Sequence, residues 1–156
     1  MRVFLLVLAL SCLGQALGAP VSALAFSNDG QVLASGGHRR VDLRSPENGS
    51  IRDSIECRFS RVTALAYSPR GELIVGGGSP GENGRAFVVD PKTKQVAREF
   101  EGYDDLVMCV AADGTRFALG SADHRATIFD GAGAVELRGH SGPVLAIAFA
   151  GDLILT

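Results

Sequence analysis

One short apolar phrase recurs along the chain at a fixed interval, and this repetition constrains the fold more than any other feature. The phrase reads VSALAF at 21–26, VTALAY at 62–67 and VLAIAF at 144–149. The first two copies begin 41 residues apart, and the second and third begin 82 residues apart, which is twice that spacing. Self-similarity at a period of about 40 residues indicates a repeat architecture.

The doubled spacing predicts a further copy between the second and the third. The segment VMCVAADG at 107–114 fills this place, although its match is weaker. We align its Val110 with Phe26 and its Gly114 with Gly30, the glycine of the turn that follows the first copy. Glycine late in such a turn adopts a positive φ at little cost.

Each unit divides into four short strands separated by turns. In the second unit these strands are VTALAY (62–67), ELIVGG (72–77), RAFVVDP (85–91) and QVAREFE (95–101), and the first unit closes with a separate strand at 51–57. No segment carries apolar residues at helical spacing over three turns. Four strands in about 40 residues predict the blade of a β-propeller, and therefore an all-β fold.

The units resemble WD40 repeats over essentially all of residues 20–156. The resemblance rests on a glycine–histidine opening, a Ser-x-Asp at the strand-to-turn position and the place that Trp-Asp occupies in the family. These positions are Gly139 and His140, Ser121 and Asp123, and Phe129 and Asp130, with Val89 and Asp90 or Arg44 and Ser45 in the earlier units. The chain contains no Trp, so the family's buried His–Ser–Asp–Trp network is incomplete. For His140 the resemblance implies a structural role, with network partners beyond Thr156.

The predicted architecture is an incomplete WD40-like propeller. We expect blades at about 20–58, 61–101 and 105–138, and the start of a fourth at 139–156. Because a blade buries its faces only against its neighbours, a partial ring leaves apolar faces open. We therefore expect an N-terminal fragment of a longer propeller protein, with edge-to-edge self-association as the alternative.

The first residues have the layout of a secretory signal peptide, predicted at 1–18. Arg2 precedes an apolar run from Val3 to Leu10, and small residues follow it up to a cut before Ala19. This run is too short for a comfortable membrane span, so no span is expected after cleavage. We therefore expect the protein to be secreted or to lie in the periplasm or cell envelope. The alternatives are a lipoprotein through Cys12, and a retained anchor or buried strand.

The remaining chemistry predicts no catalytic, metal or cofactor site. Cys57 and Cys109 lie in apolar strands, so two separate buried thiols are favoured over a bridge, which stays open. No nucleophile elbow or phosphate loop is present in the sequence. The net charge is −2 and the basic residues alternate with acids, which argues against nucleic acid as a partner.

The resemblance implies that protein partners bind the face formed by the turns between second and third strands and by the connections between blades. The residues predicted there are His38, Arg39, Arg58, Arg61, Glu82, Asn83, Arg85, Tyr103, Asp104 and His124. Arg and Tyr often dominate interface energetics. We therefore expect a non-catalytic protein-interaction scaffold. The alternative is the binding module of a larger protein or enzyme whose catalytic part lies beyond residue 156.

Overall fold

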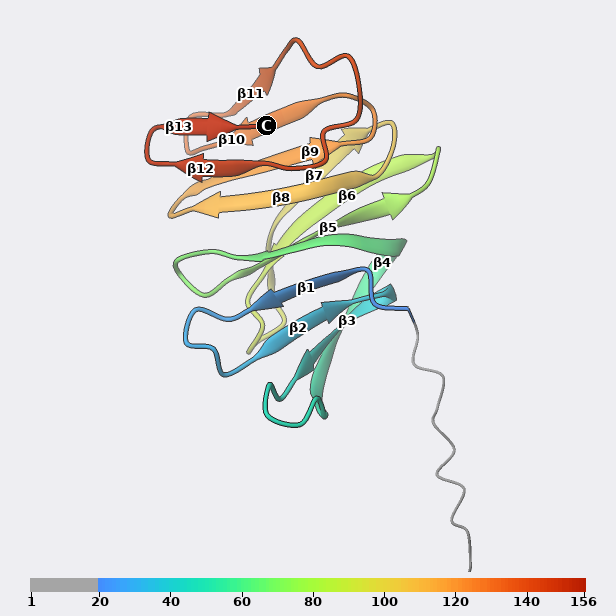
Figure 1. Ribbon diagram of the computed structural model, residues 1–156, viewed down its shortest axis with the longest axis vertical. Helices are drawn as coiled ribbons and strands as arrows, with labels where there is room; N and C mark the ends of the chain where they lie inside the picture. Colours follow the sequence, from blue (N-terminus) through green and yellow to red (C-terminus); the bar gives the residue numbers. More distant parts are fainter. Residues whose placement is uncertain (1–19) are drawn as a thin grey trace, which may run out of the picture.

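The computed structural model describes residues 20–156, and every strand in this range pairs antiparallel with its neighbours (Figure 1). No helix occurs between residues 20 and 156. The expected signal peptide at 1–18, the cut before Ala19 and the lipidation site Cys12 lie outside the described residues.

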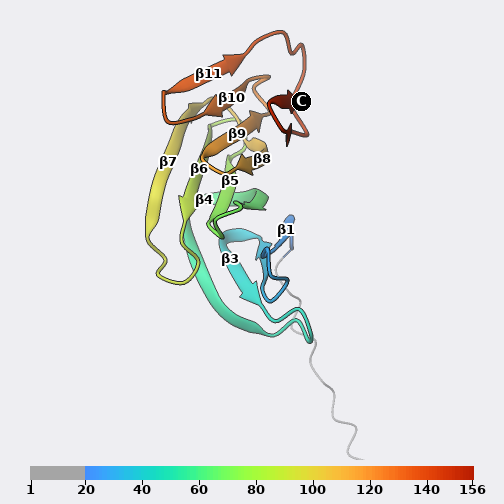
Figure 2. The ribbon, with the colours of Figure 1, turned by 90° about the vertical axis from the view of Figure 1, so that its left-hand side faces the viewer.

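The strands form three successive four-stranded blades and a final hairpin. The first blade comprises β1 (Ala23–Phe26), β2 (Leu33–Gly36), β3 (His38–Arg44) and the first half of β4 (Ile51–Tyr67). The second comprises the rest of β4, then β5 (Leu73–Ser79), β6 (Asn83–Val89) and β7 (Val96–Tyr103). The third comprises β8 (Val107–Asp113), β9 (Arg116–Ser121), β10 (Ala126–Phe129) and β11 (Ala134–Leu137), and the hairpin comprises β12 (Ala148–Ala150) and β13 (Leu153–Leu155). Figure 2 shows the fourth strands on one side of the stack and the first strands on the other.

One strand expectation is wrong, because β4 runs without a break from the first blade into the second. No Gly or Pro interrupts residues 51–67, and Ile55, Cys57 and Phe59 alternate as buried residues. The strand changes partner instead of ending: its first half pairs with β3 and its second half with β5, with a register shift between Val62 and Ala64. The first seven strands consequently form one sheet.

The weaker copy of the phrase at 107–114 aligns two residues later than the sequence indicated. Phe26 pairs with Leu33 across β1 and β2, and Ala112 pairs with Phe117 in the same way across β8 and β9. Ala112, and not Val110, is therefore the counterpart of Phe26. The β8–β9 turn is shorter than the β1–β2 turn, and this difference displaced the sequence alignment. The shorter turn still contains a glycine with positive φ, Gly114 at 60°.

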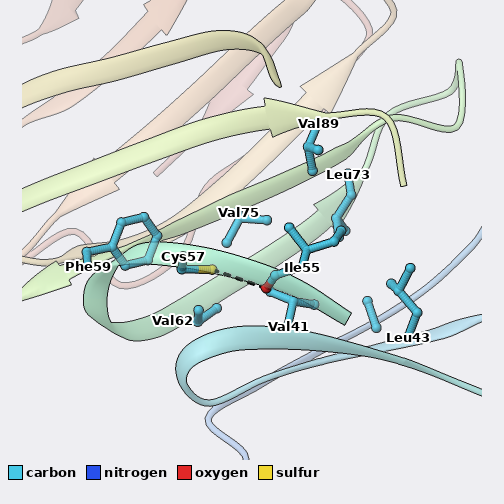
Figure 3. Packing of buried hydrophobic residues seen from close by; sticks show 10 residues of the cluster. Val41, Leu43, Ile55, Cys57, Phe59, Val62, Leu73, Val75 and Val89 are labelled. Carbon is cyan, nitrogen blue, oxygen red and sulfur yellow. Dashed lines mark hydrogen bonds between the residues drawn. The ribbon is translucent and has the colours of Figure 1, made fainter. Parts of the chain in front are cut away.

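The hydrophobic core of residues 20–156 consists of two clusters, each lying between neighbouring blades. We call the side of a blade that points toward the preceding blade its leading face, and the opposite side its trailing face. In the first blade, the leading face is the side that points away from the second blade. In the first cluster the trailing face of the first blade, with Val41 and Ile55, packs against Leu73 and Val75 on the leading face of the second (Figure 3). The second cluster repeats this arrangement between the second and third blades.

A glycine on the second strand of each blade allows the next blade to approach. A Cβ on Gly36 would lie 2.4 Å from Val62 Cγ1, one on Gly76 would lie 2.7 Å from Val110 Cγ1, and one on Gly120 would lie 2.6 Å from Val144 Cγ1. These glycines are required by close packing, because none of the three has a positive φ. A close approach of a valine from the following unit thus recurs at both blade junctions and between the third blade and the segment before the final hairpin.

Candidate interaction surface

The turns between second and third strands and the connections between blades lie on one side of the sheets, here called the turn side. In Figure 1 the β5–β6 turn lies at the right, whereas the β4–β5 and β8–β9 turns lie at the left. His38 stands opposite Arg61 in the β3–β4 register, and the Val62 amide donates to Gly37 O at 3.0 Å. The β2–β3 turn and the bend of β4 are thereby held together.

Two further bonds link the other connections of the turn side. The Gly81 amide donates to Asp105 Oδ1 at 3.0 Å, which ties the β5–β6 turn to the β7–β8 connection. The Asp104 amide donates to Asp123 Oδ2 at 2.8 Å, which ties that connection to the β9–β10 turn. The backbone of the turn side is therefore fixed from blade to blade.

Most of the residues predicted for this side present their side chains to solvent. The exposed ones are His38, Arg39, Arg58, Arg61, Glu82, Asp104 and His124, and Asn83 and Arg85 are half-buried. Arg39 and His124 occupy corresponding turns and both adopt a left-handed backbone, with φ of 59° and 72°.

Tyr103 differs from the other predicted residues, because it belongs to the core. Its exposure is 6%, it packs in the second cluster, and the Arg125 guanidinium lies 5.5 Å from its ring centroid. Burial raises the pKa of its hydroxyl to about 12. The sequence placed it at the surface because it follows Gly102 in a connection, where an aromatic side chain gives no sign of which way it points.

Arg58 and Arg85 line a groove on the outer side of the first two blades, away from the tips of the turns. The groove has a volume of about 180 Å³ and a floor that includes Phe59 and Phe100. Arg85 Nη1 forms an ion pair of 2.8 Å with Glu101. The ten predicted residues are therefore divided among the turn side, this groove and the core.

The Ser-x-Asp pair of the third blade organises a turn. Ser121 is fully buried and donates from Oγ to Asp105 O at 2.9 Å. Asp123 Oδ2 accepts from Arg125 Nε at 3.0 Å and from the Asp104 amide. Burial alone would raise the pKa of Asp123, but these donors together bring it below its ordinary value. Asp123 thus stays charged and holds two connections together.

The positions that replace Trp-Asp also have structural roles. Phe129 packs on Phe100, with ring centroids 4.4 Å apart. Asp130 Oδ1 accepts from the amides of Ala132 and Gly133 and closes the β10–β11 turn. In the first blade Arg44 stands at the Trp position and donates from Nε to Ser35 Oγ at 2.8 Å.

His140 finds its partner within the described chain. Its Nε2 lies 2.7 Å from Thr156 Oγ1. The Ser, Asp and Trp-position members of the network, expected beyond Thr156, stay a prediction. The bond agrees with a structural role for this histidine.

The two described cysteines are free thiols with little reactivity. Cys57 is buried in the first cluster, and burial raises its pKa to about 12. Cys109 is half-buried, and burial raises its pKa to about 11. Neither thiol carries the low pKa of a nucleophile.

Sequence reasoning missed a pocket that lies between the first two blades, on the side away from the turn side. It has a volume of about 540 Å³ and is lined by residues of three separate turns, including Asp29, Arg70 and Lys92, and by strand residues such as Tyr67. Lys94 Nζ pairs with Asp53 Oδ1 at 2.6 Å beside it. The only sign of this pocket in the sequence is the presence of charged residues in successive turns. Many solvated turns share that feature, so it does not reveal a pocket.

Residues 20–156 contain neither a membrane-spanning helix nor a cluster of metal ligands. No helix there is long and apolar enough to cross a membrane. No group of three or more His, Cys, Asp and Glu residues in the same range could hold a metal ion.

Antiparallel four-stranded blades that follow one another around inner first strands define the β-propeller class. A model of the family "WD domain, G-beta repeat" matches residues 10–43, a range that includes residues 10–18 of the expected signal peptide. Two solved structures, described as "Structure of U3-55K" and "Crystal structure of RRP9 WD40 repeats", share 21% and 22% identity with the chain. Each has a TM-score of 0.70 over 83% of the chain and 42% of its own.

Two curated proteins match part of the chain. DmX-like protein 1 of Homo sapiens is 35% identical and that of Mus musculus 32% identical, each over 83 residues. The match covers 52% of this chain and 3% of each DmX-like protein. The repeat, the match to the WD40 model at residues 10–43 and the likeness to two WD40-repeat structures together show a WD40-type β-propeller fold, which confirms the expected fold class.

Proposed function

We propose that this WD40-repeat protein is a non-catalytic scaffold that holds protein partners on its turn side. The observation that carries the proposal is the combination of a fixed backbone with exposed side chains. The Asp104–Asp123 and Gly81–Asp105 bonds hold the connections, while Arg39 and His124 project from them. A surface ordered before binding loses less conformational entropy when a partner docks.

Photo-crosslinking tests which side binds. A photoreactive amino acid is placed at Arg39 or His124 on the turn side, and at Arg70 or Thr93 on the opposite side as matched exposed controls. We expect crosslinks to a discrete protein partner from the first pair only. Equal crosslinking from both pairs, or from the controls alone, would contradict the proposal.

A second candidate is that the chain is the binding module of a larger protein or enzyme. The observation in its favour is coverage, since the chain spans 3% of DmX-like protein 1 and 42% of the matched solved chains. The exposed apolar residues Leu24 and Phe26 support the related proposal that this is an N-terminal part of a longer propeller, in which another blade covers them.

Reading the coding sequence past the Thr156 codon tests both ideas. Further units of about 40 residues would support the longer propeller, and a catalytic domain after them would support the larger enzyme. An immediate stop codon would contradict both and favour edge-to-edge self-association, which sedimentation then measures.

We also propose that the protein is exported, to the exterior or to the periplasm and cell envelope. The charged start, short apolar run and small residues before Ala19 support this. N-terminal sequencing of the mature protein is decisive, because the family match and the signal peptide both include residues 10–18. A start at Ala19 would support cleavage, a lipidated Cys12 would support the lipoprotein alternative, and an intact Met1 would contradict both.

A further inference from the structure

The charges of the turn side are separated along the molecule. Over the first blade and the bend of β4 stand Arg39 and Arg61, both exposed, with His38 opposite Arg61 in the register. Within residues 20–156 neither arginine forms an ion pair. Over the second and third blades stand Glu82, which is exposed, and Asp104, whose side chain is 90% exposed.

The acids near the first blade do not neutralise these arginines. Asp42, the one buried acid of residues 20–156, is already paired with Arg40 Nε at 2.9 Å and Arg44 Nη2 at 2.8 Å. Glu56, which is exposed, stands opposite Arg40 and not opposite Arg61. Arg39 and Arg61 therefore leave a local excess of positive charge at this end.

The third-blade end has the reverse imbalance. One guanidinium, that of Arg125, serves two carboxylates, Asp123 at 2.7 Å and Asp104 at 3.1 Å, and the nearby Arg85 is already paired with Glu101 at 2.8 Å. Asp105 accepts the Gly81 and Leu106 amides, and these bonds lower its pKa, so it is ionised at neutral pH. Glu82 and Asp105 form no ion pair within residues 20–156, and Asp104 shares Arg125 with Asp123, so Glu82, Asp104 and Asp105 leave an excess of negative charge at this end.

We propose, resting on the scaffold function above, that the turn side binds a polypeptide segment of mixed charge. Its acidic stretch lies over Arg39 and Arg61, and its basic stretch lies over Glu82 and Asp104. A uniform polyanion such as a nucleic acid would gain at the first end and be repelled at the other. Complementary charge of this kind sets orientation and partner choice more than raw affinity.

Fluorescence anisotropy with three labelled peptides of equal length tests the proposal on the full chain. One peptide carries a Glu block and a Lys block, the second only Glu and the third only Lys. We expect the mixed peptide to bind most tightly and to weaken as salt rises. The double variant Arg39→Glu/Arg61→Glu should raise its Kd about tenfold, the change expected for about 1.4 kcal/mol.

Two variants make the result specific. Arg70→Glu reverses an exposed charge in the β4–β5 turn on the opposite side, and it should leave the Kd unchanged. Glu82→Lys should weaken the mixed peptide and strengthen the all-Glu peptide, because it removes the repulsive end. Thermal melting by circular dichroism checks folding, with Arg39→Gln/Arg61→Gln as the milder replacement.

Three outcomes would overturn the inference. They are equal or tighter binding of the all-Glu peptide or of single-stranded DNA, no greater effect of the arginine double variant than of Arg70→Glu, and no peptide binding at low salt. If photo-crosslinks from the turn side persist in any of these cases, the scaffold proposal stands and only the charge inference fails. Loss of those crosslinks is the separate failure of the scaffold proposal.

Discussion

The leading faces of the first and second blades occupy the same place in two copies of one unit, yet their chemistry differs. The register makes Ser35, Asp42 and Arg44 of the first blade equivalent to Val75, Phe87 and Val89 of the second. In the second blade this face is covered by the first blade and is apolar. In the first blade no other blade within residues 20–156 packs on this face, and Asp42 and Arg44 form an ion pair of 2.8 Å there.

The inner strands of these two faces remain alike. Leu24 and Phe26 on β1 correspond to Leu65 and Tyr67 on β4, which pack against the first core cluster. Leu24 and Phe26 are each 60% exposed. The first leading face thus has an apolar inner strip and an ionic outer strip, so a surface that covers it must be apolar on one half and polar on the other.

The largest effect on the free energy of unfolding should come from truncating a leucine on the leading face of the second blade. The equivalent leucine on the leading face of the first blade provides the comparison. Leu73 is fully buried, whereas the equivalent Leu33 is half-buried. Leu73→Ala should lower the free energy of unfolding by about 2–5 kcal/mol, because it leaves a cavity between two blades. Leu33→Ala should cost about 1 kcal/mol, since less apolar area leaves the interior. Urea unfolding measures both, and equal losses would contradict the difference between the faces.

A smaller loss should follow from adding one methyl group at the same junction. Gly36→Ala places a Cβ 2.4 Å from Val62 Cγ1, and overpacking of this kind costs about 1–3 kcal/mol. Gly131→Ala is the matched control, because no atom lies within 4 Å of its Cβ position. Val62→Ala should partly rescue Gly36→Ala in a double-mutant cycle. Strict additivity would show that the junction is not tightly packed.

The repeat made much of this fold predictable, and the failures have specific physical causes. The strands and turns follow from the period, because each copy restarts with the same apolar phrase. The unbroken β4 was missed because a change of pairing partner leaves no turn residue between 51 and 67. Tyr103 was misplaced because burial depends on which neighbour, here Arg125, covers a connection.

The ionic strip of the first blade can be replaced by the apolar residues that stand at the same positions in the second blade. Arg44→Val removes donors to Ser35, Asp42 and Gly49 and should cost about 1 kcal/mol, reduced because the side chain is partly solvated. The triple variant Ser35→Val/Asp42→Phe/Arg44→Val should recover this loss, since apolar residues can replace an ion pair without destabilisation. It should also self-associate, because it extends the apolar surface. Sedimentation checks this, and a monomeric triple variant would show that the ionic strip does not limit association.

The smallest expected effect concerns the two cysteines. One lies at the junction between the first and second blades, and the other lies where only a hairpin follows the third blade. Cys57 lies buried between the first two blades, whereas Cys109 is half-buried and donates to Val144 O near the last hairpin. Burial raises the pKa of Cys57 from 9.0 to about 12, so the folded state keeps a proton that the unfolded state releases above pH 9. This contribution to stability is present below pH 9 and is lost as pH rises toward 12. At pH 8 a thiol reagent should modify Cys109 before Cys57 and reach Cys57 quickly only in urea. Mass spectrometry of the modified sites gives the order of reaction. Faster reaction of Cys57 would show that the final hairpin protects Cys109 from the reagent better than a full blade protects Cys57.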